Sequence, residues 1–507
     1  MLASGGQGSP RHPVTPPHSD TLLHWAVSRT LSGDTLAHSA SSRRHSRTLT
    51  MAASLLSAKD YVASKVTPEC MKSSVEEARA QINKNIPGKN QGQPDENGGK
   101  ITEYEAAWNV TNAIQGMFIV SLPYAVFHGG YWAILAMVGI AYICCYTGEI
   151  LVDCLYETNE YGDKVKVRYT YNDVAQEVFG KRFGGKIING AQLIELLMTC
   201  ILYVVLCGDL MIGAFEYGMV DARSYMMICG VILLPTAFLK DLKGVSSISF
   251  WNGIVHVVIN VLILGYCFLR INDWAFSKVT MTVDILSFPI ALGIIVFSYT
   301  SQIFVCTLEE NMVDKSKFQC MMHWSHIAAA ASKAIFGYIG FLTWQEDTQE
   351  VIVNNIEGWF KVLVNVVLVA KALLSYPLPY YAACDLLERE LFQGKPETRF
   401  PSIWALDGEL KVWGLAFRVA IIVITIVFAV FIPHFSILMG FIGNFTGCLL
   451  SFVWPAIFHL KLRRHVMGWG TMCWDIFIIF LGCMFGIVGM YYSGKALHKA
   501  FLLGGSV

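Results

Sequence analysis

Charged residues are scarce in this sequence of 507 residues. Asp, Glu, Lys and Arg together make up 15% of it, and hydrophobic residues make up 54%. A soluble domain usually carries about 25% charged residues. The deficit excludes an ordinary soluble protein and indicates a chain that is embedded in a membrane. Because the formal net charge is zero, the chain also lacks the basic excess with which nucleic-acid-binding proteins neutralise phosphate.

The sequence also lacks the spacings of common metal and redox sites. No two cysteines have C-x-x-C spacing, and most lie inside apolar runs, so we expect small buried hydrophobes rather than a disulfide framework. His323 and His326 lie one helical turn apart, but no further ligand cluster accompanies them along the chain, so no metal site is predicted. Since no nucleophile–base constellation is present either, an enzyme is not expected.

Residues 1–100 differ in composition from the remainder. The first fifty are rich in Ser, Thr, His, Arg and Pro, and the next fifty are of mixed charge. Neither half has the apolar periodicity needed to offset the entropy of ordering, so we predict a disordered region that stays in the cytosol. Met51 is an alternative start. Residues 101–507 are predicted to form a transmembrane domain.

Apolar runs of roughly 20 residues, each long enough to span a bilayer, recur after Trp108. They predict about eleven transmembrane helices. The expected spans are 108–127, 131–155, 187–213, 224–242, 247–269, 284–306, 323–344, 359–384, 412–434, 436–460 and 470–493.

Basic residues predict the orientation of these spans, because cytosolic loops carry an excess of Lys and Arg. The loops after even-numbered spans hold Lys164, Lys166, Arg168, Lys181, Arg182, Lys186, Lys240, Lys243, Lys315, Lys317, Arg389, Lys395, Arg399, Lys411, Lys461, Arg463 and Arg464. The other face holds Arg223, Arg270 and Lys278, with Lys495 and Lys499 in the tail. The N-terminus is therefore predicted to be cytosolic and the C-terminus to lie on the far side.

The first span contains polar and helix-breaking residues that an anchor does not need. Asn112, Gln115 and Gly116 lie in the first half of NVTNAIQGMFIVSLPYAVFHGG, and Pro123 lies in the second. Freed backbone groups are tolerated at membrane depth only beside protein or a cavity. We interpret the stretch as a broken helix that forms part of a polar binding site; the alternative is a kinked helix with satisfied amides.

Span six is interrupted in the same way. FPIALGIIVFSYTSQIF, from 288 to 304, contains five consecutive polar-capable residues at 298–302. Spans one and six are five apart and so cross the membrane in opposite senses. Two such breaks at corresponding positions predict an all-α, LeuT-like carrier of five-plus-five inverted repeats, with span eleven as an extra C-terminal helix.

Several strings resemble the amino acid/auxin permease family, and within it the vesicular carriers of inhibitory amino acids. They are WNVTNAIQGMF at 108–118, SLPYA at 121–125, IELLMTCILYVV at 194–205, GIIVFSYTSQIF at 293–304 and LVAKALLSYPLP at 368–379. The resemblance runs from about residue 101 to the last span. It implies a multi-pass synaptic vesicle protein that exchanges protons for GABA or glycine, depends on a vesicular proton pump and needs no cofactor. A role for chloride stays open.

A zwitterionic substrate needs partners for both of its charged ends. Backbone N–H groups freed near Asn112, Gln115 and Gly116 are expected to bind the carboxylate. Oxygen atoms of Ser298, Tyr299 and Thr300 are expected to accept from the ammonium. The alternative is that Tyr299 only packs and that the hydroxyls cap carbonyls of their own helix.

Two ionisable residues lie inside apolar spans, where a charge is costly. Glu195 in AQLIELLMTC is expected to be the proton-coupling acid or a partner of the substrate ammonium; the alternative is a structural glutamate bonded to Gln192 or to a neighbouring helix. Lys371 in LVAKALLSYP is expected to stand in for the sodium ion of related carriers, with a structural salt bridge as the alternative.

These observations together favour a proton-coupled antiporter that loads GABA and glycine across the vesicle membrane. One rival is a plasma-membrane or lysosomal amino acid permease with cation symport. Another is a channel or a non-transporting amino acid sensor. Inverted helix breaks favour a carrier over a channel or a sensor.

Overall fold

The computed structural model describes most of the transmembrane domain, and the described residues all lie in one of two compact units of the chain. The described residues are 111, 114, 116–159, 161, 163–181, 183–215, 220–238, 243–282, 284, 286–393, 398, 400–404, 410–432 and 434–502. The predicted disorder of residues 1–100 falls outside them, as do Asn112 and Gln115.

The described fold is almost entirely helical, as the sequence predicts. The α-helices are α4 (Leu122–Asp153), α5 (Tyr171–Phe179), α6 (Gly184–Ala214), α7 (Ala222–Leu233), α8 (Lys243–Leu269), α9 (Phe288–Tyr299), α10 (Gln302–Asn311), α11 (Phe318–Trp344), α12 (Trp359–Ser375), α13 (Pro377–Leu391), α14 (Val412–Phe431), α15 (Phe435–Ile442), α16 (Trp454–Leu462) and α17 (Trp469–Leu502). The shorter helical segments are η1 (Met117–Ser121), η2 (Leu234–Phe238), η3 (Ile271–Asp273), η4 (Phe276–Lys278), η5 (Lys315–Lys317), η6 (Gln345–Asp347), η7 (Ile352–Asn355) and the π-helical η8 (Gly443–Gly447) and η9 (Leu449–Val453).

The apolar helical segments agree with the prediction of about eleven spans. Within the described residues, nine helical stretches are long and apolar enough to cross a membrane, and a tenth, Ala222–Phe238, is apolar but shorter. The first stretch, Met117–Asp153, contains two spans, because Gly130 breaks it with φ 52° and ψ −138°. A Cβ at Gly130 would lie 2.1 Å from the Thr280 carbonyl oxygen, so only glycine fits this break.

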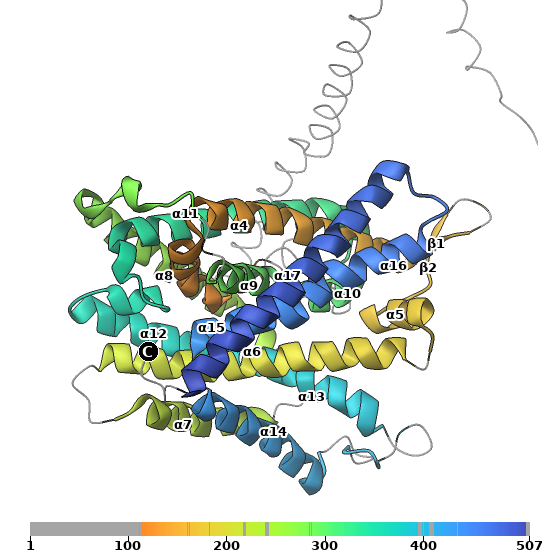
Figure 1. Ribbon diagram of the computed structural model, residues 1–507. Helices are drawn as coiled ribbons and strands as arrows, with labels where there is room; N and C mark the ends of the chain where they lie inside the picture. The colour runs from red at the N-terminus through yellow and green to blue at the C-terminus, as the bar shows by residue number, and fades with distance from the viewer. Residues whose placement is uncertain are drawn as a thin grey trace, which may run out of the picture. The chain divides into compact units, whose positions relative to one another are not determined.

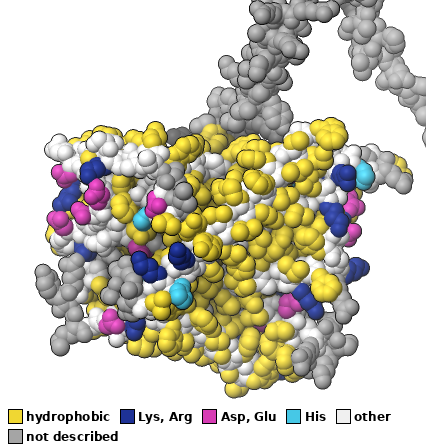
Figure 2. Space-filling view, in the orientation of Figure 1, with side chains coloured by type: hydrophobic (Ala, Val, Ile, Leu, Met, Phe, Trp, Pro, Cys, Tyr) yellow, Lys and Arg dark blue, Asp and Glu magenta, His cyan; other side chains and the backbone are white. Residues whose placement is uncertain are grey.

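The outer surface of the helices suits a bilayer. Figure 2 shows that hydrophobic side chains cover the middle of the visible face, while acidic side chains and many basic ones lie toward its left and right edges. Large apolar side chains point outward from α14 and α17, among them Ile424, Phe428, Phe431, Phe480 and Ile487. A lipid environment accepts such side chains without cost, whereas water does not. The prediction of an all-α polytopic membrane protein is confirmed.

Glycines let the central helices approach closely around α9, which Figure 1 shows between α4 and α6. A Cβ at Gly293 of α9 would lie 2.1 Å from the Gly440 carbonyl oxygen, and one at Gly443 would lie 1.9 Å from the Gly293 carbonyl oxygen. These contacts between backbones are the use of small residues that the glycine spacing in span ten predicts. They bring η8 against α9.

A short hairpin and an amphipathic helix follow the second span. Strands β1 (Tyr156–Thr158) and β2 (Lys164–Lys166) pair antiparallel, with Tyr156 opposite Lys166. Helix α5 begins with a capping box, in which the Thr170 hydroxyl accepts from the Asp173 N–H and the Asp173 carboxylate accepts from the Thr170 N–H. Such reciprocal bonds satisfy two of the free N–H groups at a helix start. We call the side of the domain that carries this hairpin, with Lys164, Lys166 and Arg168, the basic face.

Candidate functional site

The interruption predicted in span six is present and separates α9 from α10. Thr300 has an extended backbone, with φ −64° and ψ 110°, and Ser301 has φ −135° and ψ −7°. The last carbonyls of α9 and the first N–H groups of α10 therefore lack the regular hydrogen bonds of a continuous helix. Both residues lie inside the domain, where Ser301 is buried and Thr300 half-buried.

Span one is irregular at the same depth of the fold. Gly116 has ψ 171° and precedes the 3-10 segment η1, and the regular helix α4 begins only at Leu122. The Phe118 ring, in η1, contacts the Phe297 ring near the end of α9 with centroids 5.0 Å apart. The two interrupted spans therefore meet, and of the predicted carboxylate site the structure describes Gly116 alone.

A buried lysine, Lys333 in the middle of α11, lies at the end of α9. Its ammonium donates to the Ser298 hydroxyl at 3.0 Å and also to the Ser298 carbonyl. The same ammonium lies 3.7 Å from the centre of the Tyr299 ring. The C-terminus of a helix carries a partial negative charge and free carbonyls, so a cation is stabilised there, and the ring face adds a cation–π contact.

Lys333 was not among the residues predicted from the sequence. It is a single cation in an apolar run, SHIAAAASKAIFGYIG, which is the same signal that singled out Lys371. Its ammonium occupies the Ser298 oxygens that were predicted to accept from a substrate. The Ser298 hydroxyl also donates to the Ile295 carbonyl at 2.7 Å, and the Thr300 hydroxyl donates to the Val296 carbonyl at 3.2 Å.

Two hydroxyls at the break have no hydrogen-bond partner among the described residues. They belong to Tyr299 and Ser301, whose exposed fractions are 0% and 2%. A buried hydroxyl without a partner costs about 1–3 kcal/mol. These two hydroxyls are therefore available to a polar ligand. Among the predicted site residues, Tyr299 is the one whose hydroxyl has no hydrogen-bond partner within the described part of the chain.

Gln302 holds the start of α10 against two other spans. Its side-chain N–H groups donate to the Cys144 carbonyl and to the Thr147 hydroxyl of α4, each at 3.2 Å. Its side-chain carbonyl accepts from the Ser451 hydroxyl of η9 at 2.7 Å and from the Ser301 N–H at 3.1 Å. Gln302 thus fixes the geometry of the break.

Glu195 is buried in the middle of α6, with 4% of its surface exposed. One carboxylate oxygen accepts a hydrogen bond from the Thr446 hydroxyl of η8. The Thr446 hydroxyl also lies 3.2 Å from the Ile442 carbonyl. Of the two structural alternatives raised by the sequence, the partner is thus on a neighbouring helix and not Gln192.

The segment η8 connects Glu195 to the break in span six. Gly447 follows Thr446 directly, and a Cβ at Gly447 would lie 3.3 Å from the Thr300 hydroxyl oxygen and 3.2 Å from Val296. One face of this π-helical turn therefore contacts Glu195 while the next residue contacts the break. Single π-helical turns are frequent at functional sites.

Lys371 lies on α12, which packs against α6 and α8. Only 3% of its surface is exposed, and no hydrogen bond or ion pair joins its ammonium to another residue that the structure describes. The structural salt bridge considered as an alternative therefore has no partner within the described ranges. The predicted neighbour on span one includes Asn112, which lies outside them.

Four aromatic side chains pack together beside the interrupted spans. The Phe118 ring lies 5.2 Å from that of Tyr203 on α6, 5.0 Å from that of Phe297 on α9 and 6.2 Å from that of Phe435 on α15. All four residues are buried. Rings at these spacings leave little room for a substrate side chain and offer faces that attract a cation.

The basic face of the domain is closed by a network around Glu309, near the end of α10. Its carboxylate binds the Lys166 ammonium at 2.8 Å, accepts from the Tyr156 hydroxyl, and lies 3.5 Å from the Lys315 ammonium. Burial and the Glu309 charge raise the pKa of Tyr156 above its ordinary value. A surface pocket lined by Lys461 and Arg464 lies apart from the break.

Comparisons with known proteins agree on one group. The family described as transmembrane amino acid transporter protein matches residues 99–494. Vesicular inhibitory amino acid transporters of Xenopus tropicalis and Homo sapiens are each 48% identical over 405 residues, which is 79% of this chain and 78% and 77% of theirs. The Caenorhabditis elegans vesicular GABA transporter is 46% identical over 401 residues, 79% of this chain and 81% of its own. The solved inward-facing conformation of Mhp1 covers 82% of this chain and 95% of its own, with 13% identity and a TM-score of 0.49.

Proposed function

We propose a specific transport reaction, and its premise is that the chain belongs to the transmembrane amino acid transporter family. It is a secondary amino acid transporter and not an enzyme. The proposed reaction is exchange of lumenal protons for cytosolic GABA or glycine across a synaptic vesicle membrane, with the N-terminus cytosolic and the C-terminus lumenal. The printed names of relatives at 46–48% identity support the substrates and the compartment.

The contact between Glu195 and Thr446 is the observation that carries the proton-coupling role. A protonated Glu195 can donate a hydrogen bond to the Thr446 hydroxyl oxygen, and the Thr446 hydroxyl then donates its own hydrogen bond to the Ile442 carbonyl. An ionised Glu195 instead accepts a hydrogen bond from the Thr446 hydroxyl. Both protonation states keep a hydrogen bond, so the carboxyl can load and release a proton without leaving a buried group unpaired.

Substrate binding is assigned to the meeting point of the two interrupted spans. The carboxylate of the amino acid is placed at the backbone of the first break, which ends at Gly116, as in other carriers with discontinuous helices. The hydroxyls of Tyr299 and Ser301 are the free polar groups offered to the substrate at the second break, because Lys333 already occupies the Ser298 oxygens. The aromatic side chains around Phe118 favour substrates without a side chain, such as GABA and glycine.

Proton movement follows from the position of Glu195 in this scheme. In the lumen-facing state Glu195 takes a proton from the acidic side. After the carrier returns, it releases that proton to the neutral cytosol. Thr446 and Gly447 then transmit the change at Glu195 to Thr300 at the break. We place Lys371 where related carriers bind sodium, so the proposed cycle needs protons and no metal cation.

The test is uptake of labelled GABA and glycine into proteoliposomes under an imposed inside-acid, inside-positive gradient. Saturable uptake without sodium, abolished by an uncoupler and competed mutually by the two substrates, is the expected result. The matched control is Glu195→Gln, which keeps the shape and the Thr446 contact but cannot bind and release a proton. Uptake only when protons or sodium move with the substrate would favour a symporter. Binding without any uptake would favour a sensor.

A further inference from the structure

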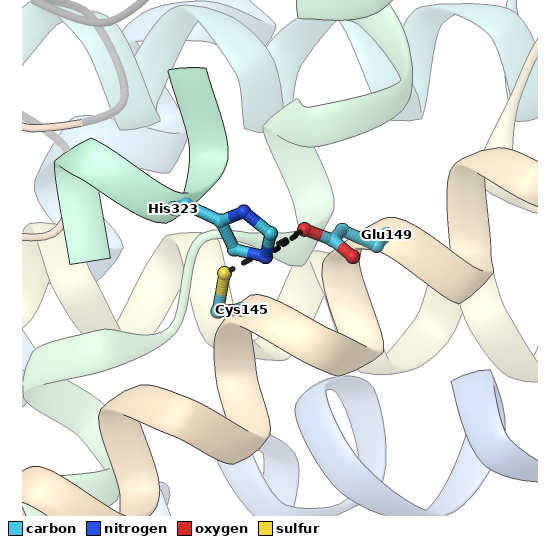
Figure 3. Close-up of side chains that lie close together, drawn as sticks. All are labelled: Cys145, Glu149 and His323. Atoms are coloured by element: carbon cyan, nitrogen blue, oxygen red, sulfur yellow. Dashed lines mark hydrogen bonds and ion pairs between the residues drawn. The ribbon is translucent and has the colours of Figure 1, made fainter. Parts of the chain in front are cut away.

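A cysteine, a glutamate and a histidine converge where the second span ends and the seventh begins (Figure 3). Cys145 and Glu149 lie four residues apart on α4, and side chains at this spacing share one face of a helix. His323 reaches them from the start of α11, which packs along α4. Gly148 permits this approach, because a Cβ there would lie 2.6 Å from Met322 Cε.

The three side chains are close enough to bind one ion. His323 Nε2 lies 2.8 Å from Glu149 Oε1, Cys145 Sγ lies 3.9 Å from the same oxygen, and the three ligand atoms lie within 4.8 Å of one another. Around a tetrahedral zinc ion, with bonds of about 2.0–2.3 Å, ligand atoms lie about 3.4–3.6 Å apart. The observed separations bracket that range, so small side-chain rotations suffice.

The chemistry of the three ligands selects the type of ion. A thiolate and an imidazole favour borderline-soft transition metals, whereas Mg²⁺ and Ca²⁺ prefer sites made of oxygen atoms. One carboxylate also suits Zn²⁺, and three protein ligands leave the fourth position for water. We propose that Cys145, Glu149 and His323 form a three-ligand site for a divalent transition-metal ion, with Zn²⁺ as the best match.

The surroundings allow an ion to enter this site. Cys145 is buried, whereas 11% of the Glu149 side chain and 30% of the His323 side chain are exposed. The opening lies on the side of the domain that carries η5 and the loop after α4. Without a metal the histidine and the carboxylate form a hydrogen-bonded pair. With a metal, α4 and α11 are joined by coordinate bonds at these ends, so binding stabilises this pair of helices.

The experiment measures binding of the metal alone to the purified full chain in detergent. The protein is treated with a chelator, then equilibrated with Zn²⁺ by dialysis, and bound zinc is counted by elemental analysis. One high-affinity ion per chain is expected. His323→Asn and Glu149→Gln should each weaken binding by tenfold or more, because loss of even an outer partner of a ligand costs roughly 10–100-fold. Cys473→Ser, which removes an exposed thiol elsewhere, should leave the affinity unchanged.

A second measurement identifies the thiolate. Co²⁺ in place of zinc gives a sulfur-to-metal charge-transfer absorption when a cysteine is a ligand, and this band should disappear in Cys145→Ser. Size-exclusion profiles show whether each variant is folded; if Cys145→Ser is not, the band in the unaltered chain and its loss in Glu149→Gln decide. Equal affinity in the unaltered chain and in His323→Asn would overturn the proposal, as would a cobalt complex without the thiolate band.

Discussion

Replacing Thr446 by valine is the most direct test of how the Glu195 carboxyl exchanges its proton. Valine has nearly the shape of threonine but no hydroxyl, and Thr446 is fully buried, so the packing of η8 should persist. The ionised carboxylate then loses its one hydrogen bond from a described residue. A hydrogen bond to a charged group is worth about 1.5–3 kcal/mol. The protonated carboxyl also loses its bond to Thr446, a neutral one worth about 0.5–1.5 kcal/mol, so the ionised form is disfavoured by about 1–1.5 kcal/mol relative to it. At about 1.36 kcal/mol per factor of ten, the proton-releasing state becomes roughly 5- to 13-fold less populated.

The assay is initial uptake of labelled GABA into proteoliposomes at a fixed interior pH and a varied exterior pH. Thr446→Val should slow uptake by about 5- to 13-fold near neutral exterior pH. The loss should shrink as the exterior is made more alkaline, because hydroxide there favours release of the proton from Glu195. Thr446→Ser keeps the hydroxyl and is the matched control, so it should transport nearly as well as the unaltered protein.

A double-mutant comparison separates this role from a general packing effect. In the Glu195→Gln background no carboxylate remains to be stabilised, so Thr446→Val should add little to the defect. The reasoning is refuted if Thr446→Val transports normally with an unchanged pH profile. It is equally refuted if Thr446→Ser is as defective as Thr446→Val, since shape and not hydrogen bonding would then be responsible.

Three further predictions concern the surrounding contacts. Phe118→Ala should admit amino acids with side chains, so alanine or serine should compete with GABA uptake several-fold better than in the unaltered protein. Lys333→Met leaves buried oxygens at the end of α9 without their cation, which costs about 1–3 kcal/mol; uptake should fall at least tenfold and the melting temperature should fall, and a normal carrier would contradict the role assigned to the ammonium. Glu309→Gln should loosen the basic face by freeing Lys166, so buried Cys306 on α10 should react faster with a polar thiol reagent, and an unchanged rate would argue against a closed network there.

Hydrophobic length and helix-breaking residues were sufficient to predict most of the fold. The spans follow from runs that must match the bilayer thickness, and the break at 298–302 follows from polar residues that compete with helical hydrogen bonds. The break between the first two spans at Gly130 was also predictable in position. The need for glycine there was not predictable, because the Thr280 carbonyl that a Cβ would meet belongs to a loop distant in sequence.

Tertiary packing decides the parts of the site that the sequence did not predict. Glu195 was identifiable as a charge inside an apolar span, but its partner Thr446 is distant along the chain and faces it only because η8 packs on α6. Lys333 satisfies the same rule as Lys371, a single cation inside an apolar run, but its contact with Ser298 depends on the packing of α11 against the end of α9. His323 was judged by its neighbour His326, whereas the structure supplies Glu149 from another helix.

The packing around α9 links the buried Glu195 carboxyl to the break between α9 and α10. Glycines at 293, 440 and 443 bring the backbones of α9 and span ten into contact, so the two segments cannot shift independently without opening a void. Thr446 and Gly447 are consecutive, and they contact Glu195 and Thr300 respectively. When the Thr446 hydroxyl changes its acceptor between Glu195 and the Ile442 carbonyl, the same turn that touches the break must accommodate the change. Because close-packed interiors favour discrete arrangements over gradual deformation, this short connection is where we propose that proton release is coupled to substrate movement.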